Sequence, residues 1–385
     1  MSARKKILWL VSWYPNRDDR FDGDFIQRHA RAAALVHDIH VIFVKDSPID
    51  SPLEEEWNHA TGLTEQLIYF RTLNGLFAKA RKQVTWQSLV RGAVKKYIKT
   101  HGLPHLVHVH VPWKAGLAAL WIRKTFGLPY VITEHWGIYN RQAEHDFHSW
   151  PFYKRSSVLK IFAGAKRTSA VSQYLASQIN KVTGCPIDDI IPNVVDTSLF
   201  FPKMEKYSRF SFVHVSNMAA WKNAGLIIRA FNECRNVLGE GVQLVMIGNR
   251  DQQYVKQAGD LGLLNDSVFF RGEMIYRDVA AELQRCHCHV LFGNLETFSC
   301  VTAESLASGL PVIVPGAGAL PELVDESNGI LVEENNVGQL RDAMIRMFRE
   351  YHLFDSSTIS REAAARFSYA AVAGHFEDFY RKSGI

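Results

Sequence analysis

The chain has 385 residues, of which 47% are apolar and 22% charged, a balance typical of globular proteins and not of disordered chains. At about 150 residues per domain, this length predicts two or three domains. No run of 18 apolar residues occurs, which argues against a transmembrane helix. The five cysteines are odd in number and scattered, which favours a reducing, cytoplasmic location over a disulfide framework.

Charge is distributed unevenly along the chain. The formal net charge is +5, yet the stretch from Gln66 to Thr133 contains eleven Lys and Arg residues and no Asp or Glu. Such a stretch predicts a strongly positive surface, and therefore an anionic partner such as phosphate, nucleic acid or a lipid headgroup.

In the first half of the chain, apolar runs typical of strands alternate with helical patterns. Strands are expected at 7–13, 39–44, 106–111, 130–133 and 168–171, and helices at 24–35, 86–99, 115–126 and 156–165. Lys5 and Lys6 precede the first apolar run as in a signal peptide. That run is short and lacks a small-residue cleavage site, so we interpret it as a strand.

The alternation restarts after a polar segment, residues 196–208, which contains Pro202 and is a candidate linker. Strands are expected at 210–215, 242–247, 268–270, 290–292 and 312–314, and helices at 226–238, 279–285, 302–308 and 337–349. The pattern predicts an α/β protein with two doubly wound Rossmann-like domains, residues 1–200 and 201–365, facing across a cleft. Residues 366–385 are expected to form a terminal helix that packs back on the first domain.

The stretch from Gly293 to Val312 has the strongest chemical signal. A strand ends near Gly293 and a helix begins close to Ser299, so backbone N–H groups and the helix dipole would favour a phosphate there. Glu304, about one turn on, could accept hydrogen bonds from two ribose hydroxyls, and Glu296 could meet a sugar hydroxyl. The plainer interpretation is a solvated Glu304 and a Ser299 that only caps its helix.

This stretch resembles the carboxyl-terminal signature of retaining glycosyltransferases of GT-B architecture, in particular family 4. The family pattern is Glu, seven residues, then Glu-Ala-x-Ala-x-Gly-x-Pro-Val, and Ser305 replaces the first Ala here. Further family-like pieces occur in the expected order over nearly the whole chain: Ser12–Pro15, Gly23–Phe25, Pro104–His110, Pro129–His135, Ile191–Asp196 and Lys222-Asn223.

The resemblance implies a metal-independent, cofactor-free enzyme that moves a hexosyl-type unit from a nucleotide diphosphosugar to a hydroxyl acceptor. It makes the first domain the acceptor side and the second the nucleotide-sugar side. It assigns catalysis to His135, Lys222 and Glu296. Donor binding is assigned to Gly23, Asn217, Lys222, Glu296, Phe298, Ser299, Cys300, Val301 and Glu304.

One departure from the family pattern concerns the diphosphate. An Arg usually stands five residues before the Lys, and Asn217 occupies that place here. Asn donates a hydrogen bond but carries no charge, so one phosphate contact would be weaker or supplied elsewhere. Two alternatives stay open: another enzyme on the same architecture, such as a nucleotide-sugar epimerase or a phosphorylase, and a non-catalytic member that binds membrane or glycan.

Three motifs could suggest a metal, and we predict none. Asp22-Gly23-Asp24 has the Asp-x-Asp form of a metal site but does not follow a hydrophobic strand. The residues of the Cys286–His289 run alternate between strand faces and cannot converge on one zinc ion. His108 and His110 share a strand face, yet no Cys or carboxylate candidate stands nearby.

The basic region, residues 71–124, includes an amphipathic helix. Trp86, Val90, Ala93 and Tyr97 share one face of it, while Arg91, Lys95 and Lys99 share the opposite flank. The helix either packs on the sheet as an ordinary surface helix or contributes to an anionic membrane surface patch. We favour a lipid-linked glycan acceptor in polysaccharide biosynthesis, at the inner face of the membrane. Nucleic acid is not expected, because the region lacks a recognised module.

Overall fold

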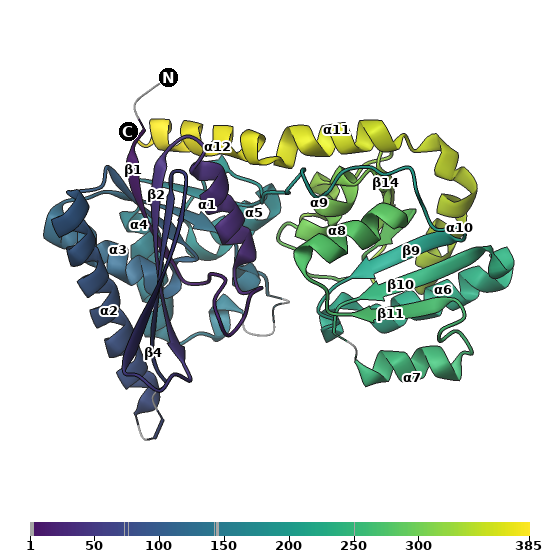
Figure 1. Ribbon diagram of the computed structural model, residues 1–385, viewed down its shortest axis with the longest axis horizontal. Coiled ribbons are helices and arrows are strands. Elements are labelled where there is room, and N and C mark those ends of the chain that lie inside the picture. Colours follow the sequence, from purple (N-terminus) through teal and green to yellow (C-terminus); the bar gives the residue numbers. More distant parts are fainter. Residues whose placement is uncertain (1–3, 73, 76, 142, 144–145, 250) are drawn as a thin grey trace. The chain divides into compact units, whose positions relative to one another are not determined.

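The computed structural model describes residues 4–72, 74–75, 77–141, 143, 146–249 and 251–385. The chain folds as two compact units (Figure 1). Unit 1 holds residues 1–194 and 369–385, and unit 2 holds residues 195–368. The chain thus passes between units at 194/195 and 368/369, where the sequence predicts 200/201 and 365/366.

Unit 1 is built on an eight-stranded sheet of order β3-β4-β2-β1-β5-β6-β7-β8. Every neighbouring pair is parallel except β3 and β4, which form an antiparallel hairpin at one edge. The strands are β1 Lys6–Val11, β2 Asp38–Ser47, β3 Leu53–Ala60, β4 Leu63–Arg71, β5 Leu106–His110, β6 Tyr130–Glu134, β7 Arg167–Ala170 and β8 Asp189–Ile190.

Helices cover this sheet. They are α1 Asp24–Ala33, α2 Ala78–His101, α3 Pro112–Phe126, α4 Phe152–Gly164, α5 Gln173–Thr183 and α12 Tyr369–Lys382, with 3-10 turns η1 Gly137–Tyr139 and η2 Phe147–Ser149. The terminal helix α12 packs against α1 within unit 1 (Figure 1). Its buried Phe376 and Tyr380 join Trp9 of β1 in the core, so the last segment of the chain completes the first unit.

Unit 2 has a six-stranded, fully parallel sheet of order β11-β10-β9-β12-β13-β14, which is the Rossmann order 3-2-1-4-5-6. Its strands are β9 Phe210–Val215, β10 Val242–Ile247, β11 Val268–Gly272, β12 Cys288–Val290, β13 Val312–Pro315 and β14 Gly329–Val332. Its helices are α6 Ala224–Leu238, α7 Gln252–Asp260, α8 Tyr276–Arg285, α9 Cys300–Ala307, α10 Val337–Glu350 and α11 Ser356–Phe367. Its 3-10 turns are η3 Ala220–Lys222, η4 Gly239–Gly241, η5 Leu320–Glu322 and η6 Tyr351–Leu353.

The predicted fold class is confirmed, since both units are α/β with largely parallel sheets. The sequence analysis missed the β3–β4 hairpin, β8 and β14, and the helices α5, α7 and α11. Strand β3 is rich in charge, with Glu54, Glu55 and Glu56 in succession at an exposed sheet edge, so its apolar signal is weak. The sequence analysis also expected β12 at 290–292, two residues beyond the observed strand, Cys288–Val290.

Each sheet has one point where the strand order reverses. It lies between β1 and β5 in unit 1 and between β9 and β12 in unit 2. In open parallel sheets, ligands bind outside the carboxyl ends of the strands at this switch point. Among the described helices, none combines the length and apolar character needed to span a bilayer.

Candidate functional site

The switch point of unit 2 carries a close ion pair. Lys222 ends the η3 turn after β9, and Glu296 lies in the loop after the neighbouring strand β12. The Lys222 Nζ lies 2.5 Å from Glu296 Oε1, and the two side chains are only 19% and 10% exposed. The structure therefore brings together two of the three predicted catalytic residues.

Asn223 ties the η3 turn to the exit of β12. It adopts a left-handed backbone with φ 54°, and its Nδ2 donates to the Phe292 carbonyl at 3.0 Å and to Asn294 Oδ1 at 3.1 Å. Gly293 leaves room beside them, because a Cβ there would lie 3.3 Å from Lys222 Cδ. These contacts fix the ammonium against the loop that carries Glu296.

Helix α9 begins directly after Ser299, which has φ 71° and ψ 81°. The N–H groups of a helix's first turn lack intrahelical partners and, with the helix dipole, favour an anion at that end. Ser299 Oγ lies 2.8 Å from Thr302 Oγ1, and Glu304 is buried in the next turn. The predicted loop–helix geometry at Ser299, Cys300 and Val301 is thus present, with the helix starting two residues before the expected residue 302.

Two predicted donor residues have other contacts. The Phe298 ring is buried against Phe367, with ring centroids 5.5 Å apart, so its side chain belongs to the core of unit 2. Asn217 is exposed in the loop after β9, where its Oδ1 accepts from the Ala219 backbone N–H at 3.2 Å. Asn217 therefore shapes the loop that leads to Lys222.

Gly318 is a site residue that the sequence analysis missed. It has φ 60°, and a Cβ there would lie 2.5 Å from the Glu296 carbonyl oxygen. The next residue, Ala319, donates its backbone N–H to that same oxygen at 3.0 Å. The loop after β13 therefore holds the peptide of Glu296, and the Gly-Ala-Gly-Ala run at 316–319 was the available signal.

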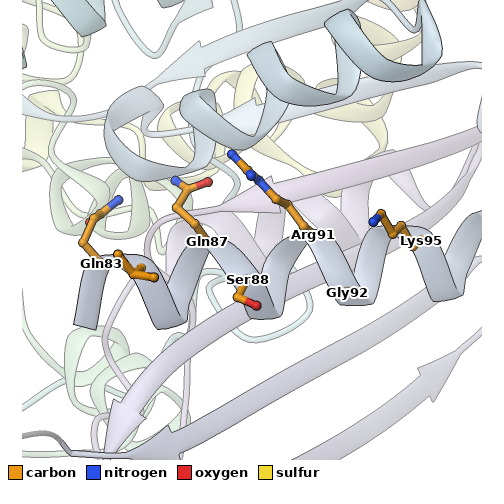
Figure 2. A pocket seen from close by; sticks show the side chains of 7 residues that line it. Gln83, Gln87, Ser88, Arg91, Gly92 and Lys95 are labelled. Carbon is orange, nitrogen blue, oxygen red and sulfur yellow. The ribbon is translucent and has the colours of Figure 1, made fainter. Parts of the chain in front are cut away.

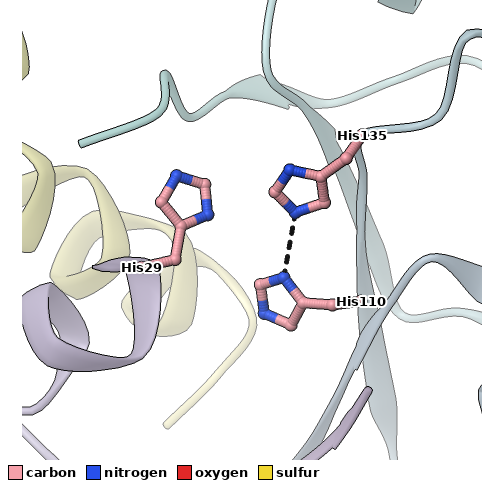
Figure 3. A group of neighbouring side chains, drawn as sticks. All are labelled: His29, His110 and His135. Atoms are coloured by element: carbon pink, nitrogen blue, oxygen red, sulfur yellow. Dashed lines mark hydrogen bonds between the residues drawn. The ribbon is translucent and has the colours of Figure 1, made fainter. Parts of the chain in front are cut away.

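His135 follows β6 in unit 1, whereas Lys222 and Glu296 belong to unit 2. It is buried with His110 of β5 and His29 of α1 (Figure 3). His110 Nδ1 lies 3.1 Å from His135 Nε2, and ligand nitrogens of all three rings lie within 4.8 Å of one another. Burial lowers the pKa of His29 to about 4 and holds the pKa of both His110 and His135 well below the ordinary value, so all three are neutral at pH 7.

Neutral imidazoles are the form that binds metals, and this is the one such group within the described residues. The rings also have protein partners, since His29 Nε2 lies 2.8 Å from the Pro192 carbonyl oxygen. His108, which the sequence pairs with His110, instead bonds Tyr380 and Thr133. Cys286 and Cys288 are buried free thiols, as core packing predicts.

Glu134, also missed from the sequence, orients the segment around His135. Its carboxyl group accepts from the backbone N–H groups of His135 at 2.8 Å and Trp136 at 3.0 Å, and from the Tyr139 hydroxyl at 2.7 Å. Burial raises the pKa of Glu134 to about 7, while these hydrogen bonds oppose the rise. The available signal in the sequence was a charged residue, Glu134, at the carboxyl end of an otherwise uncharged strand.

Gly23 begins α1 with φ 64°, and a Cβ there would lie 2.6 Å from the Trp13 carbonyl carbon. Glycine is thus required for close packing of the loop after β1. Of the two flanking aspartates, Asp22 faces Lys45 at 3.8 Å and Asp24 faces Arg28 at 3.3 Å. Both carboxylates therefore have cationic partners in the protein.

The amphipathic pattern of α2 is confirmed, because Trp86, Val90, Ala93 and Tyr97 are all buried. On its opposite flank, Gln83, Gln87, Arg91 and Lys95 follow one another along the helix and line a hollow of about 580 Å³ (Figure 2). The Arg91 guanidinium lies over the Trp121 ring of α3, 5.3 Å from its centroid.

Two family profiles match the chain. Glycosyltransferase Family 4 matches residues 26–199, and Glycosyl transferases group 1 matches residues 209–350. The chain is 22% identical to a putative teichuronic acid biosynthesis glycosyltransferase, TuaC, of Bacillus subtilis, over 90% of each chain. It is also 22% identical to a D-inositol 3-phosphate glycosyltransferase of Paenarthrobacter aurescens, over 74% of each.

Solved structures share the fold over nearly the full length. Sucrose-phosphate synthase from Thermosynechococcus elongatus superposes with a TM-score of 0.78 at 19% identity, covering 98% of this chain and 99% of that one. Anabaena HepE in complex with UDP gives a TM-score of 0.72 at 17% identity, with coverages of 98% and 99%. The two Rossmann-like units and the two profiles that follow one another along the sequence show that the chain is a glycosyltransferase of family 4 with the GT-B fold.

Proposed function

We propose that this glycosyltransferase moves a sugar from a nucleotide diphosphosugar to a hydroxyl acceptor with retention of anomeric configuration and without a metal. The observation that carries the proposal is the Lys222–Glu296 pair at the β9/β12 switch point, in the same loop system as the start of α9. An ammonium group and helix amides are the groups that stabilise a departing diphosphate.

In this proposal, the bond between the anomeric carbon and the diphosphate oxygen breaks while the acceptor oxygen bonds to that carbon from the same face. The leaving phosphate oxygen accepts the proton of the acceptor hydroxyl. Lys222 and the amides at Ser299–Val301 bind the diphosphate, Glu304 the ribose, and Glu296 the sugar. His135 is assigned a contact to the transferred sugar.

UDP is the first nucleotide to test. HepE, which has the same fold, is known in complexes with UDP and with UDP-glucose. The loop that carries Asn217 and Lys222 offers one cationic side chain, and the amides of α9 supply the remaining diphosphate contacts in this proposal.

We further propose a lipid-linked glycan acceptor used at an anionic membrane surface. The charges of α2 support this, and so do large apolar side chains exposed near the starts of α2 and α4. Phe77 is 73% exposed, Val84 70%, Phe152 78% and Tyr153 65%. Aromatic side chains of this kind enter a membrane interface while lysines attract anionic headgroups.

Substitution of the ion pair tests the donor site. Lys222→Ala and Glu296→Ala are each expected to lower turnover at least about tenfold, which corresponds to about 1.4 kcal/mol of transition-state stabilisation. Turnover is measured as transfer or hydrolysis of radiolabelled UDP-, GDP- and ADP-sugars. Lys256→Ala is the matched control, because Lys256 forms an exposed ion pair with Asp260 at 2.6 Å on α7. Full activity in both site variants would refute the assignment.

Four further measurements test the proposal against its alternatives. Excess EDTA should leave turnover unchanged, and NMR of the product should show the donor's anomeric configuration. An epimerase would convert the donor without any acceptor. Calorimetric titration with UDP, GDP and ADP that gives no binding at all would favour a non-catalytic member.

A further inference from the structure

A second pocket lies wholly within unit 1, outside the carboxyl ends of β1, β2, β4 and β5, and has a volume of about 830 Å³. It therefore occupies the switch point of the first sheet, where the order reverses between β1 and β5. Helices α2, α3 and α4 supply its other walls.

The charge of this pocket is strongly positive. Five lysines line it against two aspartates. Lys82 Nζ lies 2.7 Å from Asp46 and Lys45 Nζ lies 3.8 Å from Asp22, so both carboxylates are already paired. Within the described part of the chain, Lys114 and Lys154 have no carboxylate partner.

Lys114 is held in place by an unusual backbone. It has φ 69° and ψ −63°, and Val111 just before it has φ 57°. Ser12 Oγ lies 2.7 Å from the carbonyl oxygen of Val111 and also contacts that of Trp113, so its one hydroxyl proton is shared between them and ties this segment to the exit of β1. A non-glycine residue in this conformation is strained and persists where the surroundings enforce it, commonly at ligand sites.

Lys114 and Lys154 also repel each other. Partial desolvation in the pocket lowers the pKa of Lys114, and the charges of Lys154 and Lys82 lower it further, against the opposing effect of Asp46. A multiply charged anion between the two ammonium groups would relieve this repulsion.

Aromatic rings form the remaining walls. The Lys154 Nζ lies 5.2 Å from the centroid of the Trp113 ring and 5.4 Å from that of Trp150. Of these two rings Trp113 lines the pocket, together with Trp13, Trp86 and Tyr153. A ligand that fits is anionic at one end and has an apolar body.

We propose that this pocket binds a phosphate or diphosphate group of the acceptor, with Lys114 and Lys154 as its direct ligands. The inference rests on the proposed function, since it names the chemical class of that reaction's acceptor. The phosphate could belong to a soluble sugar phosphate or to a lipid carrier, and both present the same group to the two lysines.

Calorimetric titration of the full-length chain tests this pocket with three probes: farnesyl diphosphate, inorganic pyrophosphate and farnesol. All titrations use a Lys222→Ala background, so that the donor site of unit 2 does not capture the diphosphate. Lys114→Gln and Lys154→Gln are each expected to weaken farnesyl diphosphate binding about tenfold, as loss of a charge-assisted contact does. Lys181→Gln, which removes an exposed lysine of α5 outside the pocket, should change it less than twofold.

Pyrophosphate that binds as tightly as farnesyl diphosphate would support a soluble acceptor, and weaker binding would support a lipid carrier. The inference is overturned if farnesol binds as well as farnesyl diphosphate, or if both lysine variants bind like their parent. Nucleotide binding by the otherwise unmodified chain is a separate readout. If the unmodified chain binds no nucleotide, the proposed function is refuted. If it binds nucleotide normally but the two lysine variants bind farnesyl diphosphate as tightly as their parent, only the phosphate pocket is refuted.

Discussion

At the scale of single residues, the donor site depends on a charge pair withdrawn from water. Lys222 and Glu296 are each less than one-fifth exposed, and each needs the other because an unpaired buried charge is costly. In the proposed donor complex, the diphosphate is a second anionic partner for the Lys222 ammonium. The loop that carries Glu296 must then hold its position while Lys222 contacts both anions. The loop after β13 provides that support through Gly318 and Ala319.

Replacement of Gly318 tests this support. Gly318→Ala is expected to lower turnover about tenfold, because a Cβ would lie 2.5 Å from the Glu296 carbonyl oxygen and a left-handed alanine costs about 1–2 kcal/mol. Gly316→Ala is the control in the same loop, since its nearest neighbour would be an ordinary 3.8 Å away. Initial rates with the labelled donor measure both. Equal rates for the two variants would contradict a positioning role for Gly318.

At the scale of elements, α12 is joined to the sheet of unit 1 by a chain of buried hydrogen bonds. Trp9 Nε1 donates to the Tyr380 hydroxyl at 3.1 Å, and that hydroxyl lies 2.7 Å from His108 Nδ1. His108 Nε2 lies 2.8 Å from Thr133 Oγ1 of β6. One hydroxyl of the last helix therefore contacts polar side chains of both β1 and β5.

Removal of the Tyr380 hydroxyl should therefore loosen unit 1. Tyr380→Phe leaves two buried polar groups without a partner, which is expected to cost about 2 kcal/mol or more of unfolding free energy. Tyr153→Phe, at a 65% exposed position, should cost almost nothing. Urea unfolding followed by tryptophan fluorescence measures the difference, because eight of the nine tryptophans belong to unit 1. Equal midpoints would show that the chain of bonds contributes no stability.

At the scale of the whole molecule, buried neutral histidines occur in both units. Burial lowers the pKa of His29, His40, His214 and His287 to about 4 and that of His289 to about 3. The pKa values of His108, His110 and His135 are also well below normal. The unfolded chain takes up protons at these sites below about pH 6.5 and the folded chain does not, so acid favours unfolding.

Unit 1 should accordingly lose stability as the pH falls from 7 to 5. Each buried histidine contributes a loss of up to about 1.4 kcal/mol per pH unit below 6.5. Glu134 acts in the opposite direction, because its folded pKa of about 7 exceeds its unfolded value, so its contribution to stability is present at low pH and is lost as the pH rises towards 7. Five histidines in unit 1 outweigh one glutamate. Tryptophan-detected urea midpoints at pH 5, 6 and 7 should fall with acidity, and a flat profile would contradict the neutral, buried state of these rings.

Hydrophobic periodicity predicted the α/β class, two largely parallel sheets and most of the helices around them, because alternating apolar runs report which faces are buried. The resemblance to family 4 pointed to Lys222 and Glu296, which the structure places in contact, and the strand–loop–helix pattern predicted a helix start near Ser299, where α9 begins. The helical face of Trp86, Val90, Ala93 and Tyr97 was predictable for the same reason of periodicity.

Which distant residues meet could be read only from the folded chain. Lys114 and Lys154 are far apart in sequence, and nothing local to either indicates a common pocket or a missing carboxylate. The same holds for Gly318 beside Glu296, and for His29 beside His110 and His135. Periodicity records burial along one element, whereas the identity of the neighbour across a loop depends on strand order and on long-range packing that no short segment encodes.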